Sequence, residues 1–302
     1  MCKMKQKLLI IGGSGLLGST LIEYALSDYE IHATFNKNTI QNTNVSSTQV
    51  ELLNDRAKIV NLIKSFKPDI VVHTAAHSSV DVCETNHKVA DTLHVDITQD
   101  IANICAELNS KLIYISTDAV FEGQFNKKYT EEDKPNPINY YGKTKLEAEK
   151  VVLGSDSKNT ILRTSVIYGW HKKSRFTNWI LDALRAQKIV DPFIDQYNTP
   201  TLVDDIAKSI LLIITLGISG LYHTTGKTCI NRYEFAVELA NSFGYDKNLI
   251  KPVTSLEKKQ DAPRPMSTCL NSSKLEMMIN YHFLDIKSGI SFILKKSQED
   301  IL

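Results

Sequence analysis

Apolar residues in the first half of the chain fall into short runs separated by longer amphipathic stretches. Each run is typical of a strand that is buried on both faces. The runs lie at residues 7–11, 30–35, 49–53, 69–76, 111–118 and 160–169. Between them, apolar residues recur at helical spacing, most clearly at 17–25 and 88–108, and Asp55 can cap a further helix. Strands alternating with helices predict an α/β protein with a Rossmann-type, doubly wound parallel sheet.

This alternation stops after residue 169, and three helical stretches joined by loops follow at 176–187, 203–216 and 232–243. The turn at 198–205 leads into the second of these helices, and Thr201 can cap it. No shift in composition marks a linker. We therefore expect a dinucleotide-binding domain over residues 1–168, with a return segment near 200–225. A smaller, interleaved, mainly substrate-binding region is expected over residues 169–302.

The charge balance narrows the choice of partner. The 302 residues include 35 Lys and Arg against 34 Asp and Glu, which argues against nucleic acid or an anionic membrane. The longest later apolar stretch, 210–218, is too short to cross a bilayer and is predicted to be a buried helix. Five scattered cysteines without a Cys-x-x-Cys pair predict reduced thiols in a cytoplasmic protein, with neither disulfide nor metal site.

A glycine-rich turn follows the first apolar run. A strand, a glycine-rich turn and a helix follow one another here. This order is typical of sites in which a dinucleotide phosphate binds at the N-terminus of the helix. Gly12 can adopt backbone angles closed to other residues. Gly15 leaves no Cβ facing the ligand, and Gly18 lets the helix pack closely. The residues of this turn expected to bind the cofactor are Gly12, Ser14, Gly15, Leu16, Leu17 and Gly18.

The residues after the second predicted strand indicate which cofactor binds. An acid there would accept hydrogen bonds from the adenosine ribose and favour NAD, but this chain has Asn36 and Lys37. Because Lys37 can pair with a 2′-phosphate, we expect NADP, with NAD as the alternative if Lys37 is only a solvated surface lysine. Leu52 can cover the adenine. Small residues after the fourth strand let the cofactor lie close; they are Thr74, Ala75 and Ala76.

Tyr141 and Lys145 form the candidate proton-transfer pair. They are four residues apart on a predicted helix and so share a face. A phenol is a poor acid at neutral pH, but a nearby ammonium stabilises the phenolate and lowers the pKa. Lys145 can also hold the nicotinamide ribose. Thr117, at the end of the fifth strand, is expected to orient a substrate carbonyl, with Ser116 as the alternative; Tyr140 lies off this spacing.

With these motifs in order, the chain resembles an extended short-chain dehydrogenase/reductase and, within that superfamily, the dTDP-4-dehydrorhamnose reductase family. The motifs include His-Thr-Ala-Ala-His at 73–77, Ile-Ser-Thr-Asp at 115–118 and Tyr-Tyr-Gly-Lys-Thr-Lys at 140–145. Similar segments cover nearly the whole chain in the expected order. They lie at 12–18, 73–84, 115–123, 129–133, 136–146, 161–165, 195–201, 264–265 and 273–275.

The resemblance implies reduction of the 4-keto group of a nucleotide-linked sugar with NADP(H) as cofactor. Tyr141 would supply the proton, Lys145 would tune its pKa, and Thr117 would orient the keto oxygen. A core salt bridge is the alternative role for Arg264. The resemblance adds cofactor contacts at Tyr141, Lys145 and Ser165, and substrate contacts at Val120, Phe121, Gln196 and Arg264.

Two positions depart from the families that the chain resembles. Sugar-nucleotide dehydratases follow the threonine with Asp-Glu, whereas Ala119 follows Asp118 here, so the acid–base pair for dehydration is incomplete. Ala119 also stands where the reductases often have tyrosine. His94 occupies a place where asparagine is usual, and we expect it to be a structural histidine rather than a catalyst.

Two other functions share this scaffold. The regulatory beta subunit of methionine adenosyltransferase resembles the chain near Val95 and Asp96 and at 141–146, which would make the chain a cofactor-binding interaction subunit. A nucleotide-sugar epimerase that retains NAD is the third alternative. Turnover of a keto sugar distinguishes them. For the reductase we expect a nucleotide-sugar substrate, a homodimer, and neither nucleic acid nor membrane as partner.

Overall fold

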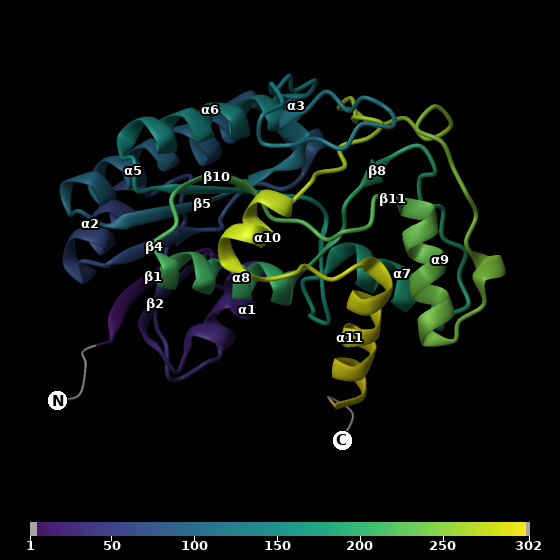
Figure 1. Ribbon diagram of the computed structural model, residues 1–302, viewed down its shortest axis with the longest axis horizontal. Helices are drawn as coiled ribbons and strands as arrows, with labels where there is room; N and C mark the ends of the chain where they lie inside the picture. Colours follow the sequence, from purple (N-terminus) through teal and green to yellow (C-terminus); the bar gives the residue numbers. More distant parts are fainter. Residues whose placement is uncertain (1–4, 300–302) are drawn as a thin grey trace.

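A computed structural model, which describes residues 5–299, shows a seven-stranded parallel sheet with helices on both faces (Figure 1). Neighbouring strands run parallel in the order β10–β6–β5–β4–β1–β2–β3. The predicted doubly wound sheet is thereby confirmed. The strands are β1 (Gln6–Ile11), β2 (Tyr29–Phe35), β3 (Ser46–Gln49), β4 (Ile70–His73), β5 (Lys111–Thr117), β6 (Thr160–Thr164) and β10 (Gly220–His223).

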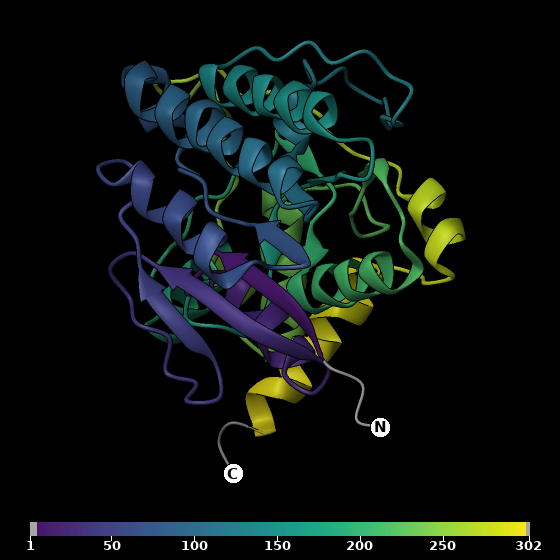
Figure 2. The same ribbon diagram turned by 90° about the vertical axis from the view of Figure 1, so that its left-hand side faces the viewer.

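The central strands are apolar throughout because helices cover both faces of the sheet. On β1, Leu8 and Ile10 face one helix layer, Leu9 and Ile11 face the other, and all four are fully buried. Figure 2, turned by 90°, shows the two layers. The first contains α1 (Leu16–Ala25), α8 (Val203–Leu216) and α10 (Ser273–Ile279), and the second contains α2 (Arg56–Phe66), α5 (Ile97–Glu107) and α6 (Tyr140–Ser155).

The second half of the chain builds another apolar core beside the sheet. Two short strand pairs accompany this core, one parallel and one antiparallel. Its helices are α7 (Arg175–Arg185), α9 (Arg232–Phe243) and α11 (Ile286–Glu299). The strand pairs are β7 (Ile167–Tyr168) with β9 (Thr201–Leu202), and β8 (Tyr197–Asn198) with β11 (Ile230–Asn231). Between these elements, α8 and β10 return to the sheet, and β10 extends it beyond β6.

Two buried acids fasten the returning helix α8. Asp204 accepts a hydrogen bond from Tyr24 Oη on α1 at 3.0 Å. Asp205 accepts one from Tyr281 Oη at 2.6 Å and one from the Leu284 backbone N–H at 2.9 Å. Both acids lie in the first turn of α8, where the helix dipole favours negative charge. They therefore tie α1 and the C-terminal segment to the same helix.

Three details of the predicted elements are wrong. The third strand is at 46–49 rather than 49–53, and it is a polar edge strand that needs no apolar run because it is largely exposed. The predicted strand at 160–169 ends at Thr164, and residues 167–168 pair with β9 instead. Thr201 does not cap α8, because it lies in β9 and its hydroxyl donates to Thr199 O.

The helix predicted over 88–108 is broken by a π-helical turn. This turn spans Asp91–Asp96, between α4 (His87–Ala90) and α5, and α3 (Val80–Thr85) precedes them. His94 lies in the turn and is 1 % exposed. Its Nε2 accepts the His77 backbone N–H at 3.2 Å, and its Nδ1 lies 2.8 Å from Thr144 Oγ1. The structural role expected for His94 agrees with this placement.

The expectation of reduced thiols is wrong for one pair of cysteines. Cys229 and Cys269 form a disulfide with their Cα atoms 5.5 Å apart. They are 40 residues apart in the chain, and they meet because β11 and residue 267 both pair with β8. Sequence spacing does not reveal such a pairing. Cys83 and Cys105 are buried free thiols, and Cys2 lies outside the described residues.

Across residues 5–299, no helix is long and apolar enough to cross a membrane. The same residues contain no group of three or more His, Cys, Asp or Glu side chains placed to hold a metal ion.

The turn between β1 and α1 depends on glycines with no room for a side chain. Gly12 has a φ of +92°, a region that favours glycine. A Cβ on Gly18 would overlap Gly12 O and lie 2.8 Å from Gly13 Cα. By contrast, a Cβ on the exposed Gly15 would meet only Gly12 O, at 3.2 Å. Close backbone packing therefore shapes the turn at Gly12 and Gly18 and leaves the start of α1 open.

Three buried histidines make the fold sensitive to acid. His73, His94 and His223 are at most 1 % exposed. Burial lowers the pKa of each to about 3, and Lys145 (for His73 and His94) and Arg163 (for His223) add to the shift. In the unfolded chain histidine titrates near pH 6.5. The folded protein therefore keeps its full stability with respect to these groups above about pH 6.5. As the pH falls toward 3, the free energy of unfolding decreases because the unfolded chain binds protons that the buried imidazoles do not.

Gly18→Ala should destabilise the protein by about 1–3 kcal/mol, because the added methyl group must displace backbone atoms of the turn. Urea unfolding measures the change. Gly154→Ala is the matched control: Gly154 lies in α6 with nothing within 4 Å of an added Cβ. There alanine should raise stability by about 0.5–1 kcal/mol. Equal stability of the two variants would contradict the packing argument.

His223→Phe should weaken the dependence of stability on pH. Both ring nitrogens of His223 lack hydrogen-bond partners among the described residues, and the ring meets Phe121 edge-on. Between pH 7.5 and pH 5, wild type should lose about 2 kcal/mol more unfolding free energy than the variant, as urea unfolding would show. His282→Phe, at a side chain that is 77 % exposed, is the control. Parallel losses in wild type and His223→Phe would refute the assignment.

Candidate active site

The predicted site residues gather at the carboxyl ends of the parallel strands. The strand order reverses between β1 and β4, since β2 and β3 lie beyond β1 whereas β5 and β6 lie beyond β4. Doubly wound sheets bind ligands at such a point. The residues after these two strands meet there, because Thr74 Oγ1 lies 2.9 Å from Ile11 O and 3.3 Å from Gly12 O. The glycine turn therefore lies at the ligand-binding edge of the sheet.

The start of α1 fits a phosphate group. No side chain caps its first turn, so the backbone N–H groups there can bind an anion. Ser14, Gly15 and Leu16 are accessible. Leu17 is 5 % exposed and its side chain belongs to the apolar core. Only the backbone of Leu17 can therefore meet a ligand.

The residues expected around the rest of the cofactor lie along the same edge. Asn36 and Lys37 are exposed beyond β2, and Asn36 O accepts a hydrogen bond from Gln49 Nε2 at 2.9 Å. Leu52 is 9 % exposed and packs in the core beneath α2. After β4, Thr74 and Ala75 are partly exposed and Ala76 is exposed.

Thr117, Tyr141 and Lys145 lie at the junction of β5 and α6. Thr117 ends β5, Tyr141 is the second residue of α6, and Lys145 lies one turn further. Gly142 lets the first turn of α6 pack closely on the loop after β5, because a Cβ at this position would overlap Ala119 O. This packing places Tyr141, the predicted proton donor, beside Thr117, the predicted orienting hydroxyl.

Lys145 is a buried ammonium held from β5. The residue is 2 % exposed, and Nζ donates hydrogen bonds to Tyr114 Oη and Ile115 O, each at 2.6 Å. Burial lowers the pKa of Lys145 to about 7, while Glu149 and Cys83 act in the opposite direction. The ammonium form of Lys145 is therefore less favoured than that of an exposed lysine.

The pKa of Tyr141 moves in the direction opposite to the one expected from Lys145. Burial raises it, a hydrogen bond with Thr117 acts against the rise, and the charge of Asp118 adds to it. The lowering expected from Lys145 is not found, because Nζ is turned to acceptors on β5. Tyr141 is thus held as a neutral phenol that can donate a proton.

Ser116 is engaged elsewhere and does not compete with Thr117. It is 3 % exposed and donates a hydrogen bond to Glu149 Oε1. Glu149 also pairs with Arg163 at 2.7 Å, and both side chains of this pair are 3 % exposed. Thr117 lies outside this ion-pair cluster, but its hydroxyl also has partners: it donates to Asp118 Oδ1 and accepts the Ala119 backbone N–H, each at 3.1 Å.

Asp118 ties the sheet edge to the second half of the chain. Its Oδ2 accepts hydrogen bonds from Ser165 Oγ at 2.7 Å, Asn198 Nδ2 at 3.0 Å and Thr268 Oγ1 at 2.5 Å. Its Oδ1 accepts one from Thr117 Oγ1 at 3.1 Å. Four segments of the chain therefore converge on one carboxylate beside Thr117. Ser165, expected to contact the cofactor, is one of them.

The structure does not bring the side chains of Val120 and Phe121 to a surface. Both are fully buried, and the Phe121 ring stacks on Tyr129 with centroids 4.1 Å apart. Leu270 belongs to the same small cluster. Their backbone groups are also engaged, since Val120 O accepts the Asn136 N–H and the Phe121 N–H donates to Asp118 O. The structure therefore does not place either residue at a ligand-accessible surface.

Gln196 and Arg264, by contrast, are polar groups held in place by partners. Gln196 Nε2 donates to Ser255 Oγ at 2.9 Å and to Gln260 Oε1 at 2.7 Å. Arg264 forms an ion pair with Asp81 on α3 at 2.7 Å, and its side chain is 16 % exposed. The alternative of a paired arginine is therefore observed. This ion pair joins the C-terminal part of the chain to the loop region after β4.

Two residues of this region carry no sequence motif. Tyr114 contacts Lys145. The sequence signals this residue only through its position on β5, where Tyr114 and Ser116 point to the same face of the sheet. Arg232, the first residue of α9, lies 5.3 Å from the centroid of the Phe176 ring. Burial lowers the pKa of Arg232 to about 10; Asp118 opposes this shift and Arg264 adds to it. Only the fold brings these charges together.

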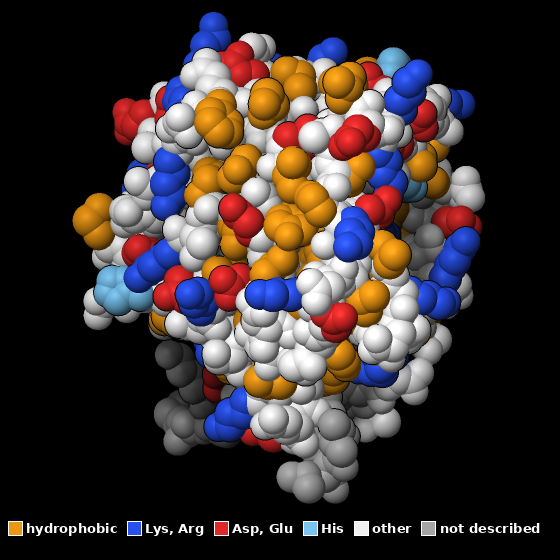
Figure 3. All heavy atoms as spheres, turned by 90° about the vertical axis from the view of Figure 1, so that its right-hand side faces the viewer, with side chains coloured by type: hydrophobic (Ala, Val, Ile, Leu, Met, Phe, Trp, Pro, Cys, Tyr) orange, Lys and Arg blue, Asp and Glu red, His pale blue; other side chains and the backbone are white. Residues whose placement is uncertain are grey.

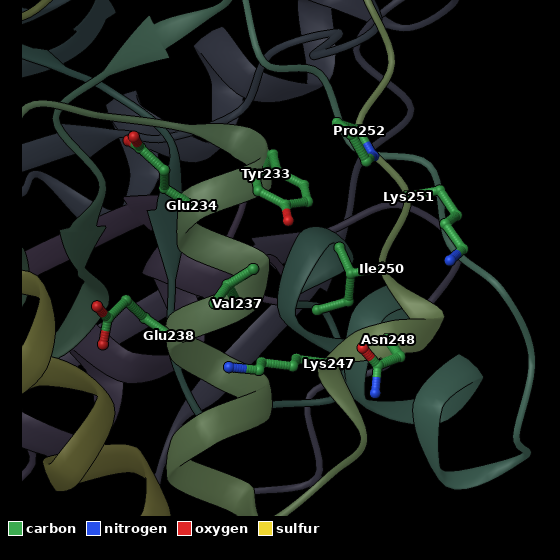
Figure 4. A pocket seen from close by; sticks show the side chains of 9 residues that line it. All are labelled: Tyr233, Glu234, Val237, Glu238, Lys247, Asn248, Ile250, Lys251 and Pro252. Atoms are coloured by element: carbon green, nitrogen blue, oxygen red, sulfur yellow. The ribbon is translucent and has the colours of Figure 1, made fainter.

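A surface cavity of about 500 Å³ lies elsewhere, between α9 and the segment 247–252 (Figure 4). Tyr233 and Val237 on α9 face Ile250 across it, and charges of both signs line it, Glu238 and Lys247 among them. None of the predicted site residues lines this cavity. The candidate active site is therefore at the sheet edge and not in this cavity.

Several known proteins are similar to the chain over most of its length. The family of the RmlD substrate binding domain matches residues 6–299. A dTDP-4-dehydrorhamnose reductase from Aggregatibacter actinomycetemcomitans is 31 % identical over 283 residues, which cover 89 % of this chain and 92 % of that protein. Methionine adenosyltransferase 2 subunit beta from Rattus norvegicus is 33 % identical over 283 residues, which cover 90 % of this chain and 82 % of that protein.

A solved structure is similar over the whole fold. The crystal structure of dTDP-4-dehydrorhamnose reductase from Bacillus anthracis in complex with NADP matches with a TM-score of 0.88 at 26 % identity. The match covers 97 % of this chain and 100 % of that chain. The motifs, the sheet and these relatives agree: the chain belongs to the family of the RmlD substrate binding domain.

Proposed function

We propose that the protein reduces the 4-keto group of a nucleotide-linked sugar with NADPH. The observation that carries this proposal is the placement of Thr117, Tyr141 and Lys145 at the sheet edge that also holds the glycine turn. Two relatives support the substrate class and the cofactor. They are the 31 % identical dTDP-4-dehydrorhamnose reductase and the similar reductase structure in complex with NADP.

The proton transfer follows from the three side chains. Bound NADPH would supply the hydride that adds to the carbonyl carbon. Thr117 Oγ1 would exchange its hydrogen bond to Asp118 Oδ1 for one to the keto oxygen and so orient it. Tyr141 transfers its Oη proton to that oxygen as the alcohol forms. Two N–H groups of the Lys145 ammonium donate to acceptors on β5, so only its remaining N–H would be available to stabilise the phenolate that Tyr141 becomes. A neutral, partly exposed phenol one helical turn from a buried cation suits these proton and charge movements.

The edge residues would hold the cofactor along its length. The open start of α1, with Ser14, Gly15 and Leu16, suits the pyrophosphate. Exposed Lys37 suits a 2′-phosphate, and no acid at the end of β2 repels it, which favours NADP over NAD. Lys145 would also bind the nicotinamide ribose.

Residues of the second half would bind the substrate. The charge of Arg264 adds to the lowering of the pKa of Arg232, so the two guanidinium groups are near one another. Two such groups suit the two charges of a diphosphate. Gln196 would contact the sugar, whereas Val120 and Phe121 are fully buried and would shape the site from beneath. On this assignment, residues 1–168 and the return segment bind mainly the cofactor, and residues 169–302 mainly the substrate.

A second candidate function is that of a cofactor-binding regulatory subunit. The observation in its favour is the 33 % identity to the rat methionine adenosyltransferase 2 subunit beta over 90 % of the chain. This identity is as high as that to the reductase. In such a subunit the three catalytic side chains would be kept without turnover.

Location and assembly are part of the proposal. We place the protein in the cytoplasm, because the reaction requires a supply of NADPH; the Cys229–Cys269 disulfide is the observation that weighs against it. We also propose a homodimer. Apolar side chains gather between charged ones on the face that carries α7 and α9 (Figure 3), and Trp179 and Ile189 are exposed there at 43 % and 65 %.

Tyr141→Phe should lower kcat for NADPH oxidation with a dTDP-4-keto sugar about 10²–10⁴-fold, because a phenyl ring has no proton to donate. Steady-state kinetics measure the loss. Tyr140→Phe is the matched control: its hydroxyl bonds to Asp91, so this variant should keep wild-type turnover. If wild type turns over no nucleotide-linked keto sugar but binds tightly to a methionine adenosyltransferase, the regulatory function replaces the reductase.

A further inference from the structure

Lys145 is held by a tyrosine that the proposed reaction does not use. Nζ donates to Tyr114 Oη at 2.6 Å and lies 4.0 Å from the centroid of the Tyr114 ring. The other acceptor, Ile115 O, belongs to the backbone. Over residues 5–299, no further side chain accepts a hydrogen bond from Lys145. Tyr114 is 1 % exposed, so water does not compete for its hydroxyl.

We propose that Tyr114 is a positioning residue for Lys145: its hydroxyl oxygen holds one N–H of the ammonium so that another faces Tyr141 and the cofactor ribose. An ammonium has three N–H groups, and Tyr114 and Ile115 accept two of them. Both acceptors lie on β5, whereas Tyr141 lies one turn before Lys145 on α6. The third N–H is therefore left for the reaction. This inference rests on the proposed function.

Tyr114 is suited to accept a hydrogen bond rather than to donate the substrate's proton. Burial raises the pKa of Tyr114 well above its ordinary value, and the charges of Tyr141 and Glu149 add to the rise. The hydroxyl therefore keeps its proton and offers a lone pair. His73 packs against the Tyr114 ring with centroids 5.6 Å apart. This contact restricts the ring without providing another partner for Lys145.

Groups from several elements face Lys145. Burial acts most strongly against the ammonium, and Glu149 and Cys83 favour it. Tyr114 is the neutral acceptor among these groups, so its loss would remove a hydrogen bond without removing a charge. The titratable groups around Lys145 are Tyr141 and Glu149 on α6, Tyr114 on β5, His73 on β4, His94 in the π-helical turn and Cys83 on α3.

Tyr114→Phe removes only this oxygen and should lower the pKa of Lys145 by about one to two pH units, because a buried cation loses an acceptor. The ¹³Cε chemical shift of Lys145 in lysine-labelled protein reports the titration, assigned by the signal that Lys145→Arg removes. Wild-type Lys145 should titrate near pH 7. Tyr168→Phe, a buried tyrosine of the core around α9 and α11, is the matched control and should titrate like wild type.

Kinetics separate positioning from general damage. Reduction requires the ammonium, so the alkaline limb of the kcat profile should move to lower pH in Tyr114→Phe, and kcat at pH 8 should fall about tenfold. KM for NADPH should rise, because Lys145 also holds the ribose. KM for the keto sugar should stay within about twofold, since the substrate residues are untouched. Thermal unfolding checks that each variant is folded.

Two results would overturn the proposal. One is a wild-type Lys145 ammonium whose protons exchange with water as rapidly as those of an exposed lysine, a measurement that needs no variant to fold. The other is a folded Tyr114→Phe that keeps the wild-type titration and pH profile. Absence of turnover in wild type would contradict the proposed function alone, because the titration tests Tyr114 in the protein without substrate.

Discussion

The active-site edge depends on holding one ammonium charge where almost no water reaches. A buried cation is costly unless hydrogen-bond acceptors replace its water. Consecutive residues of β5 supply these acceptors to Lys145, so the charge is placed by how α6 packs on β5. Gly142 serves the same packing, because any side chain there would push the first turn of α6 away from the loop after β5.

Asp118 extends this arrangement into the second half of the chain. Its carboxylate joins the end of β5 to residues near 165, 198 and 268. The disulfide at Cys269 lies directly after Thr268, which donates to Asp118, and its other half, Cys229, directly precedes β11. The segments that face the sheet edge are therefore linked to one another covalently as well as by hydrogen bonds.

This arrangement also gives Lys145 a structural role that does not depend on turnover. Lys145 is buried and satisfies backbone and side-chain acceptors inside the fold, and the partly exposed Tyr141 contacts Thr117. Their removal would leave buried polar groups without partners, which is destabilising whether or not a reaction occurs. Packing alone is thus a reason to keep these residues in a relative without turnover.

The sequence by itself determined the features whose signals are local. Helical spacing placed α8 and α9 at their observed bounds, the glycines marked the turn after β1, and four-residue spacing put Tyr141 and Lys145 on one face. Contacts between distant segments were decided only by the tertiary structure. The Cys229–Cys269 pairing, Arg232 near Asp118, and the rise in the pKa of Tyr141 all depend on burial and on neighbours far away in the chain. Those are consequences of packing, and no stretch of local sequence carries them.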